Sequence, residues 1–138
     1  MTPDQIRYVQ DTFARIAPVA DNAAALFYER LFTLDPSLRA LFRGDMVGQG
    51  RMLMQTLALA VRSLQNPTPL VPALEQMGRR HVTYGVHEEH YATVGAALLW
   101  TLEQGLADAW TPEVAEAWTA AYTLLANVMK DGARQAAA

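Results

Sequence analysis

The sequence LVPALEQMGRRHV, residues 70–82, reads as a single amphipathic helix with a histidine on its apolar side. Side chains three or four residues apart share one face of a helix. His81 is therefore expected on the buried stripe, whereas Arg79 and Arg80 point elsewhere. The stripe consists of Leu70, Leu74, Met77 and His81.

The same helical spacing recurs along the chain, and proline, glycine or a capping residue stands where each run stops. Thr111-Pro112-Glu113, for example, combines a capping threonine with a first-turn proline and an acid. No segment alternates polar and apolar residues as a strand does. We predict an all-α fold of about seven unequal helices. The expected segments are Thr2 to Pro18, Asp21 or Asn22 to Asp35, a short turn over 38–42, 46–65, 70–82, 87–107, and Thr111 to Asp131-Gly132, with fraying over 135–138.

Composition restricts the function classes. The 138 residues are 51% hydrophobic and 18% charged, which favours one folded domain over residues 1–138. The net charge of −3 does not favour a nucleic-acid partner. The chain has no cysteine, which excludes disulfides, thiolate metal sites and haem attached through C-x-x-C-H. The polar start and the lack of a long apolar run predict a cytoplasmic protein with no membrane span.

His81 has two interpretations from its position alone. A histidine on a buried stripe is most often a core residue whose ring nitrogens bond backbone carbonyls. A neutral imidazole facing an apolar cavity also suits one axial ligand of a haem. A rival hypothesis is zinc held by His81, His87 and His90, but Gly85 interrupts the segment between the first of these and the other two.

Two polar residues on apolar helix faces could supply hydrogen-bond donors opposite His81. Tyr28 lies four residues after Ala24 and four before Phe32. Gln49 lies one turn before Leu53, so both project from one side of the same helix. Neither residue by itself is strong evidence for a ligand site. Buried tyrosines usually pack as core aromatics, and a glutamine in the first turn of a helix is most often a surface residue. Motifs for nucleophilic catalysis or phosphate binding are missing from the sequence.

In combination, these residues resemble bacterial single-domain haemoglobins of the flavohaemoglobin and Vitreoscilla class. The resemblance covers nearly the whole chain and implies the globin fold around a haem pocket. The motifs that carry it are Phe27-Tyr28-Glu29-Arg30-Leu31-Phe32, Asp35-Pro36, Leu41-Phe42, Gly78-Arg79-Arg80-His81, Tyr84-Gly85-Val86, His90-Tyr91, Val94-Gly95, Ala117-Trp118, Tyr122 and Leu125-Ala126.

On the proximal side, the resemblance implies that His81 is the ligand of iron in a non-covalent haem b. Tyr91 would lie near it. Arg79 or Arg80 would reach a haem propionate by a charge-assisted bond, and the sequence does not choose between them.

On the distal side, the resemblance implies that Tyr28 hydrogen-bonds bound oxygen and that Gln49 faces the ligand. Leu53 would limit the ligand space, and Phe42 would pack on the haem face. The implied function is reversible binding of O2, also of NO and CO, and support of nitric oxide dioxygenation with a separate reductase. A gas sensor and a haem-free interaction module are the alternatives.

Two departures from the family pattern matter. The acid that pairs with the proximal histidine in flavohaemoglobins aligns with Ala133, and Asp131 is the nearest carboxylate. The default partner of the His81 Nδ1–H is then a backbone carbonyl of its own helix. We also expect no reductase domain within residues 1–138, which implies a separate electron-donating reductase and a monomer or weak homodimer.

Overall fold

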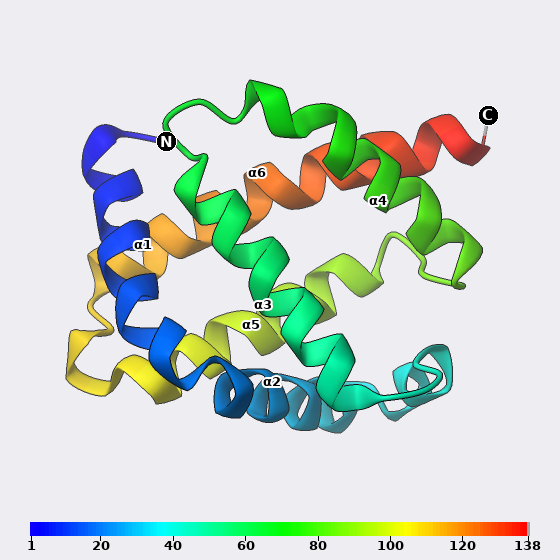
Figure 1. Ribbon diagram of the computed structural model, residues 1–138, viewed down its shortest axis with the longest axis horizontal. Helices are drawn as coiled ribbons and strands as arrows, with labels where there is room; N and C mark the ends of the chain where they lie inside the picture. Colours follow the sequence, from blue (N-terminus) through cyan, green and yellow to red (C-terminus); the bar gives the residue numbers. More distant parts are fainter. Residues whose placement is uncertain (138) are drawn as a thin grey trace.

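The computed structural model of the chain describes residues 1–137. Over that range the chain is helical and contains no strand, which confirms the predicted all-α fold. The α-helices, six in the described range, are α1 (Pro3–Ile16), α2 (Ala20–Leu34), α3 (Met46–Arg62), α4 (Val71–Thr83), α5 (His90–Leu106) and α6 (Pro112–Ala137) (Figure 1). Short 3-10 segments join them: η1 (Ala17–Val19), η2 (Pro36–Leu41), η3 (Thr68–Leu70) and η4 (Ala107–Ala109).

Side-chain caps start several of these helices at the predicted residues. Thr2 Oγ1 accepts from the Gln5 backbone N–H at 3.1 Å, and the Gln5 side chain accepts from the Thr2 N–H at 3.0 Å. This reciprocal pair satisfies two backbone donors that the first turn leaves without partners. Thr111 caps α6 in the same sense, accepting from the Val114 N–H at 3.2 Å.

Two helices are shorter than predicted, because local side chains bond the backbone. α3 ends at Arg62 rather than at Gln65, since the Ser63 hydroxyl donates to the Leu59 carbonyl at 2.8 Å and Ser63 leaves helical geometry. α5 begins at His90 rather than at His87, because residues 87–90 form a turn. In that turn the His87 N–H donates to His90 Nδ1 at 2.9 Å.

Two other helices are longer than predicted. α2 begins at Ala20, ahead of Asp21, because η1 leads directly into it without a side-chain cap. α6 does not stop at Asp131-Gly132 but continues through Ala137. Gly132 belongs to the helix because it lies against α4, so the expected fraying over 135–137 is wrong, and residue 138 lies outside the described range.

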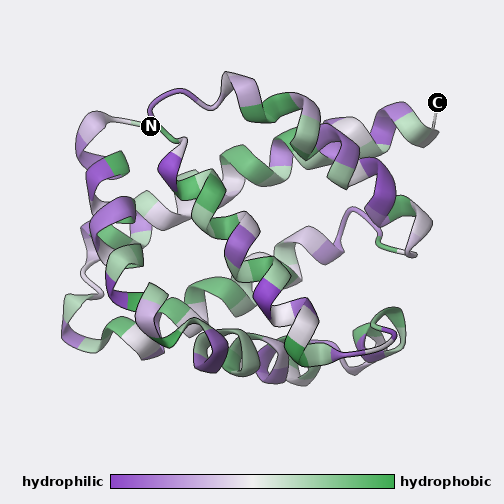
Figure 2. Cartoon of the chain, in the orientation of Figure 1, coloured by the Kyte–Doolittle hydropathy of each residue, from purple (hydrophilic) through white to green (hydrophobic). Residues whose placement is uncertain are grey.

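The core is centred where α1 crosses α6. Trp118 is 1% exposed, and its indole N–H donates to Thr12 Oγ1 at 2.9 Å. The Thr12 hydroxyl in turn donates to the Tyr8 carbonyl at 2.6 Å, so the buried polar atoms are paired. Hydrophobic and hydrophilic positions alternate around the helices, as expected for one buried face per helix (Figure 2). Among the described helices, none combines the length and the apolarity needed to cross a bilayer.

Helix α4 is attached differently from the others. Of the long helices in the described part of the chain, it packs closely only on α6, whereas α2 packs on both α3 and α5 (Figure 1). Glycines make the α4–α6 contact close. A Cβ atom on Gly78 would lie 1.9 Å from the Met129 carbonyl oxygen, and one on Gly132 would lie 2.1 Å from the Glu75 carbonyl oxygen. The two backbones therefore touch, and α4 stands apart from α3.

Replacing Gly132 with alanine tests this crossing. Alanine has the higher helix propensity, but its Cβ would meet the backbone of Glu75, which no rotamer can relieve. We expect a loss of about 1–3 kcal/mol in the free energy of unfolding, typical of overpacking, measured by urea titration. Gly105→Ala is the control, since that Cβ would meet only the flexible end of Ile16. Equal effects of the two changes would contradict the crossing.

Candidate functional site

His81 lies in the last turn of α4 and is half-buried. Its Nδ1 is 2.6 Å from the carbonyl oxygen of Met77, one turn earlier, as expected from the sequence. A carbonyl only accepts hydrogen bonds, so Nδ1 carries the proton and Nε2 keeps its lone pair. Burial lowers the pKa of His81, the Met77 bond partly opposes this, and the charge of Arg80 lowers it further. The side chain is thus a neutral imidazole with one nitrogen free to bind a metal.

An aromatic cluster forms a wall on another part of the molecule. The cluster consists of Tyr28 and Phe32 of α2 and of Phe42, which follows η2. All three are far from His81 in the sequence. The Tyr28 and Phe42 rings are 5.3 Å apart, edge to face, and Phe32 lies 5.4 Å from Phe42. Such tilted pairs place ring edges against ring faces and stabilise the cluster. The structure therefore brings together two of the sequence-predicted residues, Tyr28 and Phe42.

Tyr28 places a protonated hydroxyl in this wall. Its side chain is 8% exposed, and burial raises its pKa to about 12, so the hydroxyl stays protonated at neutral pH. Gly50 of α3 lies beside it: a Cβ there would be 2.9 Å from Ala24 Cβ and 3.8 Å from the Tyr28 ring. The missing side chain lets α3 approach α2 at this point. Tyr28 is therefore placed next to the first turns of α3.

Gln49 and Leu53 occupy one face of α3, directly before and one turn after Gly50. Both side chains are half-buried, unlike Met52, which is 66% exposed. Their similar burial is consistent with the expectation that Gln49 and Leu53 lie on the same face of α3. The amide of Gln49 and the hydroxyl of Tyr28 both come from the α2–α3 layer, whereas His81 comes from α4.

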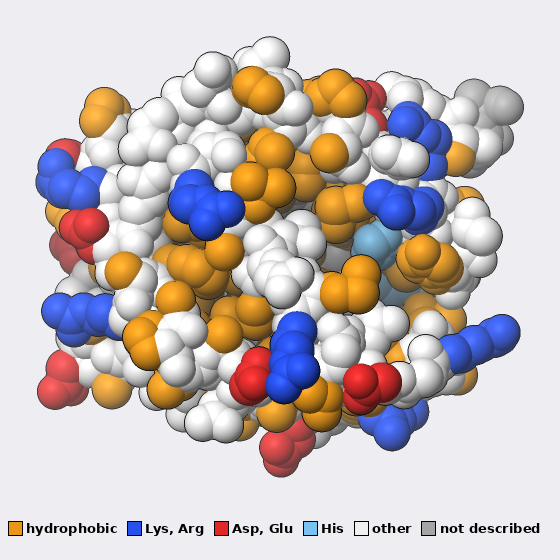
Figure 3. All heavy atoms as spheres, in the orientation of Figure 1, with side chains coloured by type: hydrophobic (Ala, Val, Ile, Leu, Met, Phe, Trp, Pro, Cys, Tyr) orange, Lys and Arg blue, Asp and Glu red, His pale blue; other side chains and the backbone are white. Residues whose placement is uncertain are grey.

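These two groups of residues lie on elements that do not pack on each other, because α4 rests on α6 and stands off from α3. The end of α4 turns toward η2: a Cβ on Gly85, which has φ of +94°, would lie 3.2 Å from the Leu41 side chain. Figure 3 shows histidine atoms between hydrophobic side chains on one face of the molecule, beside a hollow. The His81 imidazole thus comes from α4, whereas the Tyr28 hydroxyl and the Gln49 amide come from α2 and α3.

Tyr91 lies at the start of α5, where its hydroxyl is buried and has no hydrogen-bond partner among the described residues. Its backbone carbonyl accepts from the Tyr122 hydroxyl at 2.6 Å. Burial raises the pKa of both phenols. Buried hydroxyls are almost always paired, so an unpaired one indicates a site for a further group.

The two arginines have different environments. Arg79 Nη1 donates to Gln135 Oε1 on α6 at 3.1 Å, so it faces the helix on which α4 packs. Arg80 is exposed, and its charge acts on His81. The two neighbouring arginines therefore differ: Gln135 holds Arg79, whereas the charge of Arg80 acts on His81.

The carboxylate nearest in sequence to the missing family acid does not act on His81. Asp131 is 61% exposed and pairs with Arg134 at 3.3 Å. Because α6 stays helical through Gly132, Asp131 is not released toward α4. His81 has the Met77 carbonyl as its partner instead.

The zinc hypothesis fails. Within residues 1–137, no group of three histidines or carboxylates is arranged to hold a metal ion. His90 Nδ1 accepts a hydrogen bond from the His87 backbone N–H, so that nitrogen is not free to bind a metal. The His87 and His90 rings lie 5.3 Å apart, in the segment that follows α4.

Sequence reasoning found one of the partners that fix these side chains and missed another. A carbonyl of the same helix was expected for His81, and the structure identifies it as that of Met77, four residues earlier. The bond between Arg79 and the Gln135 amide could not be predicted from local sequence, because the two residues are 56 positions apart.

Comparison with known proteins gives the family. The Globin family profile matches residues 25–129, which include every candidate site residue named above. The chain belongs to the globin family. This globin is 37% identical over 134 residues to a flavohemoprotein of Xylella fastidiosa, a match covering 94% of this chain and 33% of that protein. It is 32% identical to a flavohemoprotein of Vibrio cholerae, with 95% and 34% covered. The globin therefore spans about one third of the length of these curated relatives.

Solved structures agree on the fold. A bacterial globin from Campylobacter jejuni matches with a TM-score of 0.85 at 24% identity, covering 97% of both chains. An engineered carbene transferase, made from a proposed nitric oxide dioxygenase of Rhodothermus marinus, matches with a TM-score of 0.87 at 26% identity. That match covers 98% of this globin and 94% of the other chain.

Proteins of the globin family bind haem with iron. The residues of this globin fit that group on three observations: the Nε2 of His81 is available, the Tyr91 hydroxyl is buried without a partner, and an aromatic wall includes Phe42. A large, flat, mostly apolar cofactor needs such surroundings, together with one basic nitrogen for iron.

His81→Ala tests the metal-ligand role. We expect the purified variant to lose haem or to hold it weakly, because no second imidazole shares the last turn of α4. Absorbance of the reduced and CO-treated protein measures this. His87→Ala and His90→Ala are the matched controls and should leave the spectrum unchanged. Haem loss in His90→Ala with a normal spectrum in His81→Ala would refute the assignment.

Proposed function

We propose that this globin binds a non-covalent haem b and uses it to bind O2, NO or CO reversibly. The observation that carries the proposal is the His81–Met77 hydrogen bond, which fixes the tautomer and leaves Nε2 as a metal donor. When bound, haem supplies a ferrous iron that takes a diatomic gas, and nitric oxide dioxygenation joins O2 and NO to nitrate while the iron becomes ferric.

The roles of the chain's own residues follow from their chemistry. Phe42 and Leu53 exclude water from the apolar side of the pocket. Tyr28 stays protonated and donates a hydrogen bond to a ligand that carries partial negative charge, and Gln49 adds an amide donor. Oxygen gains more from these donors than CO does, because CO carries less charge.

His81 would hold the iron through Nε2, Tyr91 would lie nearby, and Arg80 or Arg79 would bind a propionate. Repeated dioxygenation needs one electron per turnover, which we assign to a reductase outside residues 1–138. We further propose a cytoplasmic location and a monomer or weak homodimer. The Rhodothermus marinus relative supports the dioxygenase activity without establishing it for this chain.

One absorbance spectrum tests the central proposal. A Soret band that shifts on reduction and on addition of CO is the expected result. A purified protein that takes up no haem would favour the interaction module instead. NO consumption with and without an added reductase then separates a dioxygenase from a gas-binding protein.

Tyr28→Phe tests the distal donor. Loss of a hydrogen bond with a net value of about 0.5–1.5 kcal/mol predicts oxygen release that is a few-fold to about tenfold faster. Stopped-flow mixing or flash photolysis measures the rate, and CO release should change less. The double change with Gln49→Ala should exceed either single change. Tyr8→Phe on α1 is the control, and equal oxygen off-rates in every variant would contradict the role of Tyr28.

The proximal side gives a spectroscopic prediction. A neutral carbonyl draws less on the Nδ1–H than a carboxylate would, so His81 keeps less anionic character. Resonance Raman of the deoxy form should show a lower iron–histidine stretching frequency than in relatives that keep the acid. Asp131→Asn should leave it unchanged, since Asp131 faces Arg134. A high frequency that falls in Asp131→Asn would show that Asp131 acts on His81.

A further inference from the structure

The position of His81 depends on how α4 is held, and α4 is held by α6. The two helices touch through their backbones at Gly78 and Gly132. Gly78 is three residues before His81, and the His81 ring is tied to α4 by Met77. The imidazole and α4 therefore move together, and any slide or rotation of α4 on α6 moves Nε2 by a similar amount.

A polar latch holds the two helices in register beyond the glycine contact. Gln135 Nε2 donates to Glu75 Oε2 at 2.9 Å, and Gln135 Oε1 accepts from Arg79 at 3.1 Å. One amide on α6 thus binds two side chains on α4 that are one turn apart. Arg79 is two residues from His81, so the latch acts close to the imidazole.

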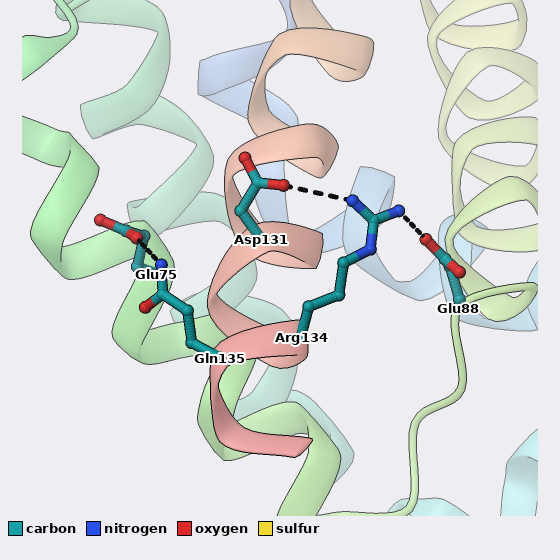
Figure 4. Close-up of polar contacts among 5 residues, drawn as sticks. All are labelled: Glu75, Glu88, Asp131, Arg134 and Gln135. Atoms are coloured by element: carbon teal, nitrogen blue, oxygen red, sulfur yellow. Dashed lines mark hydrogen bonds and ion pairs between the residues drawn. The ribbon is translucent and has the colours of Figure 1, made fainter. Parts of the chain in front are cut away.

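The second part of the latch holds the segment that follows α4. Arg134 pairs with Glu88, which lies between α4 and α5, and with Asp131 on its own helix (Figure 4). Figure 4 shows Arg134 between the two acids and Gln135 directed toward Glu75. Neighbouring residues of α6 thereby reach both the body of α4 and the loop beyond its end.

We propose that Gln135 and Arg134 are positioning residues for His81, which they hold in place by latching α4 and the 84–89 segment onto α6. This inference rests on the proposed function, because it assigns a purpose to the position of Nε2. A metal ligand must be held within about 0.5 Å of its working position. Because α4 packs closely only on α6 among the described helices, the contacts with α6 are what fix its position.

The alternative is that the latch only adds stability. Its ion pair is widely exposed, with Arg134 at 63% and Glu88 at 57% of the side chain. Exposed pairs of this kind contribute little to the free energy of unfolding. A large effect on α4 and His81 with an unchanged unfolding midpoint would therefore separate positioning from stability.

The test compares Gln135→Ala/Arg134→Ala with a matched control, Gln65→Ala/Arg7→Ala. The control removes the exposed amide pair between Gln10 and Gln65 and the Arg7–Asp4 ion pair at 2.9 Å, contacts in which no residue of α4 takes part. In the haem-free proteins, we expect backbone amides of α4 in the latch variant to exchange about tenfold faster with D2O, because local opening becomes easier. Amides of α1 should not change.

In the haem-loaded proteins, transfer of haem to an apomyoglobin trap should be about tenfold faster in the latch variant, the lower end of the loss seen when a supporting partner of a metal ligand is removed. The iron–histidine stretch should broaden or shift, and the urea midpoint should match the control. Wild-type rates of α4 exchange, or a fall in midpoint with faster exchange in every helix, would overturn the proposal. If the wild type takes up no haem, the proposed function fails, and the exchange measurement still decides whether the latch holds α4.

Discussion

The attachment of α4 to one neighbour is the physical constraint on which the candidate site depends. A helix packed on all sides would bury His81 among side chains and leave no room for a cofactor. Here the apolar contacts of α4 are made with α6, through glycines that bring the backbones together. The His81 imidazole near the end of α4 is oriented by its own helix, through the Met77 carbonyl.

The aromatic wall of α2 and the segment after η2 is held in a different way. Phe42 packs edge to face on both Tyr28 and Phe32, which stack on each other, and Gly50 lets α3 lie against α2 beside them. The hydroxyl of Tyr28 is therefore positioned by ring packing and stays protonated because it is buried. The α4–α6 pair thus positions the imidazole of His81, and the α2–α3 pair positions the hydroxyl of Tyr28.

Much of this arrangement could be predicted from the sequence, because helical spacing and caps are local signals. The spacing of Leu74, Met77 and His81 gave the stripe, and Thr111-Pro112 gave the start of α6. The missed features depend on contacts between distant segments. Asp131-Gly132 reads locally as a helix end, but Gly132 is there for the close approach of α4. The bond that distinguishes Arg79 from Arg80 likewise depends on Gln135, which lies on another helix. The unpaired hydroxyl of Tyr91 is a property of burial, which no local pattern encodes.

The hydrogen bond from Trp118 to Thr12 has a consequence for how the chain folds during synthesis. It joins residues 106 positions apart, so the α1–α6 contact closes a very long loop. A chain emerging from the ribosome cannot complete this contact until α6 is outside the exit tunnel. Until then Val9 and Phe13 have no α6 surface to cover them, although both are buried in the finished fold. α1 therefore waits for α6, and apolar surface at Val9 and Phe13 stays uncovered while the residues between the two helices are made.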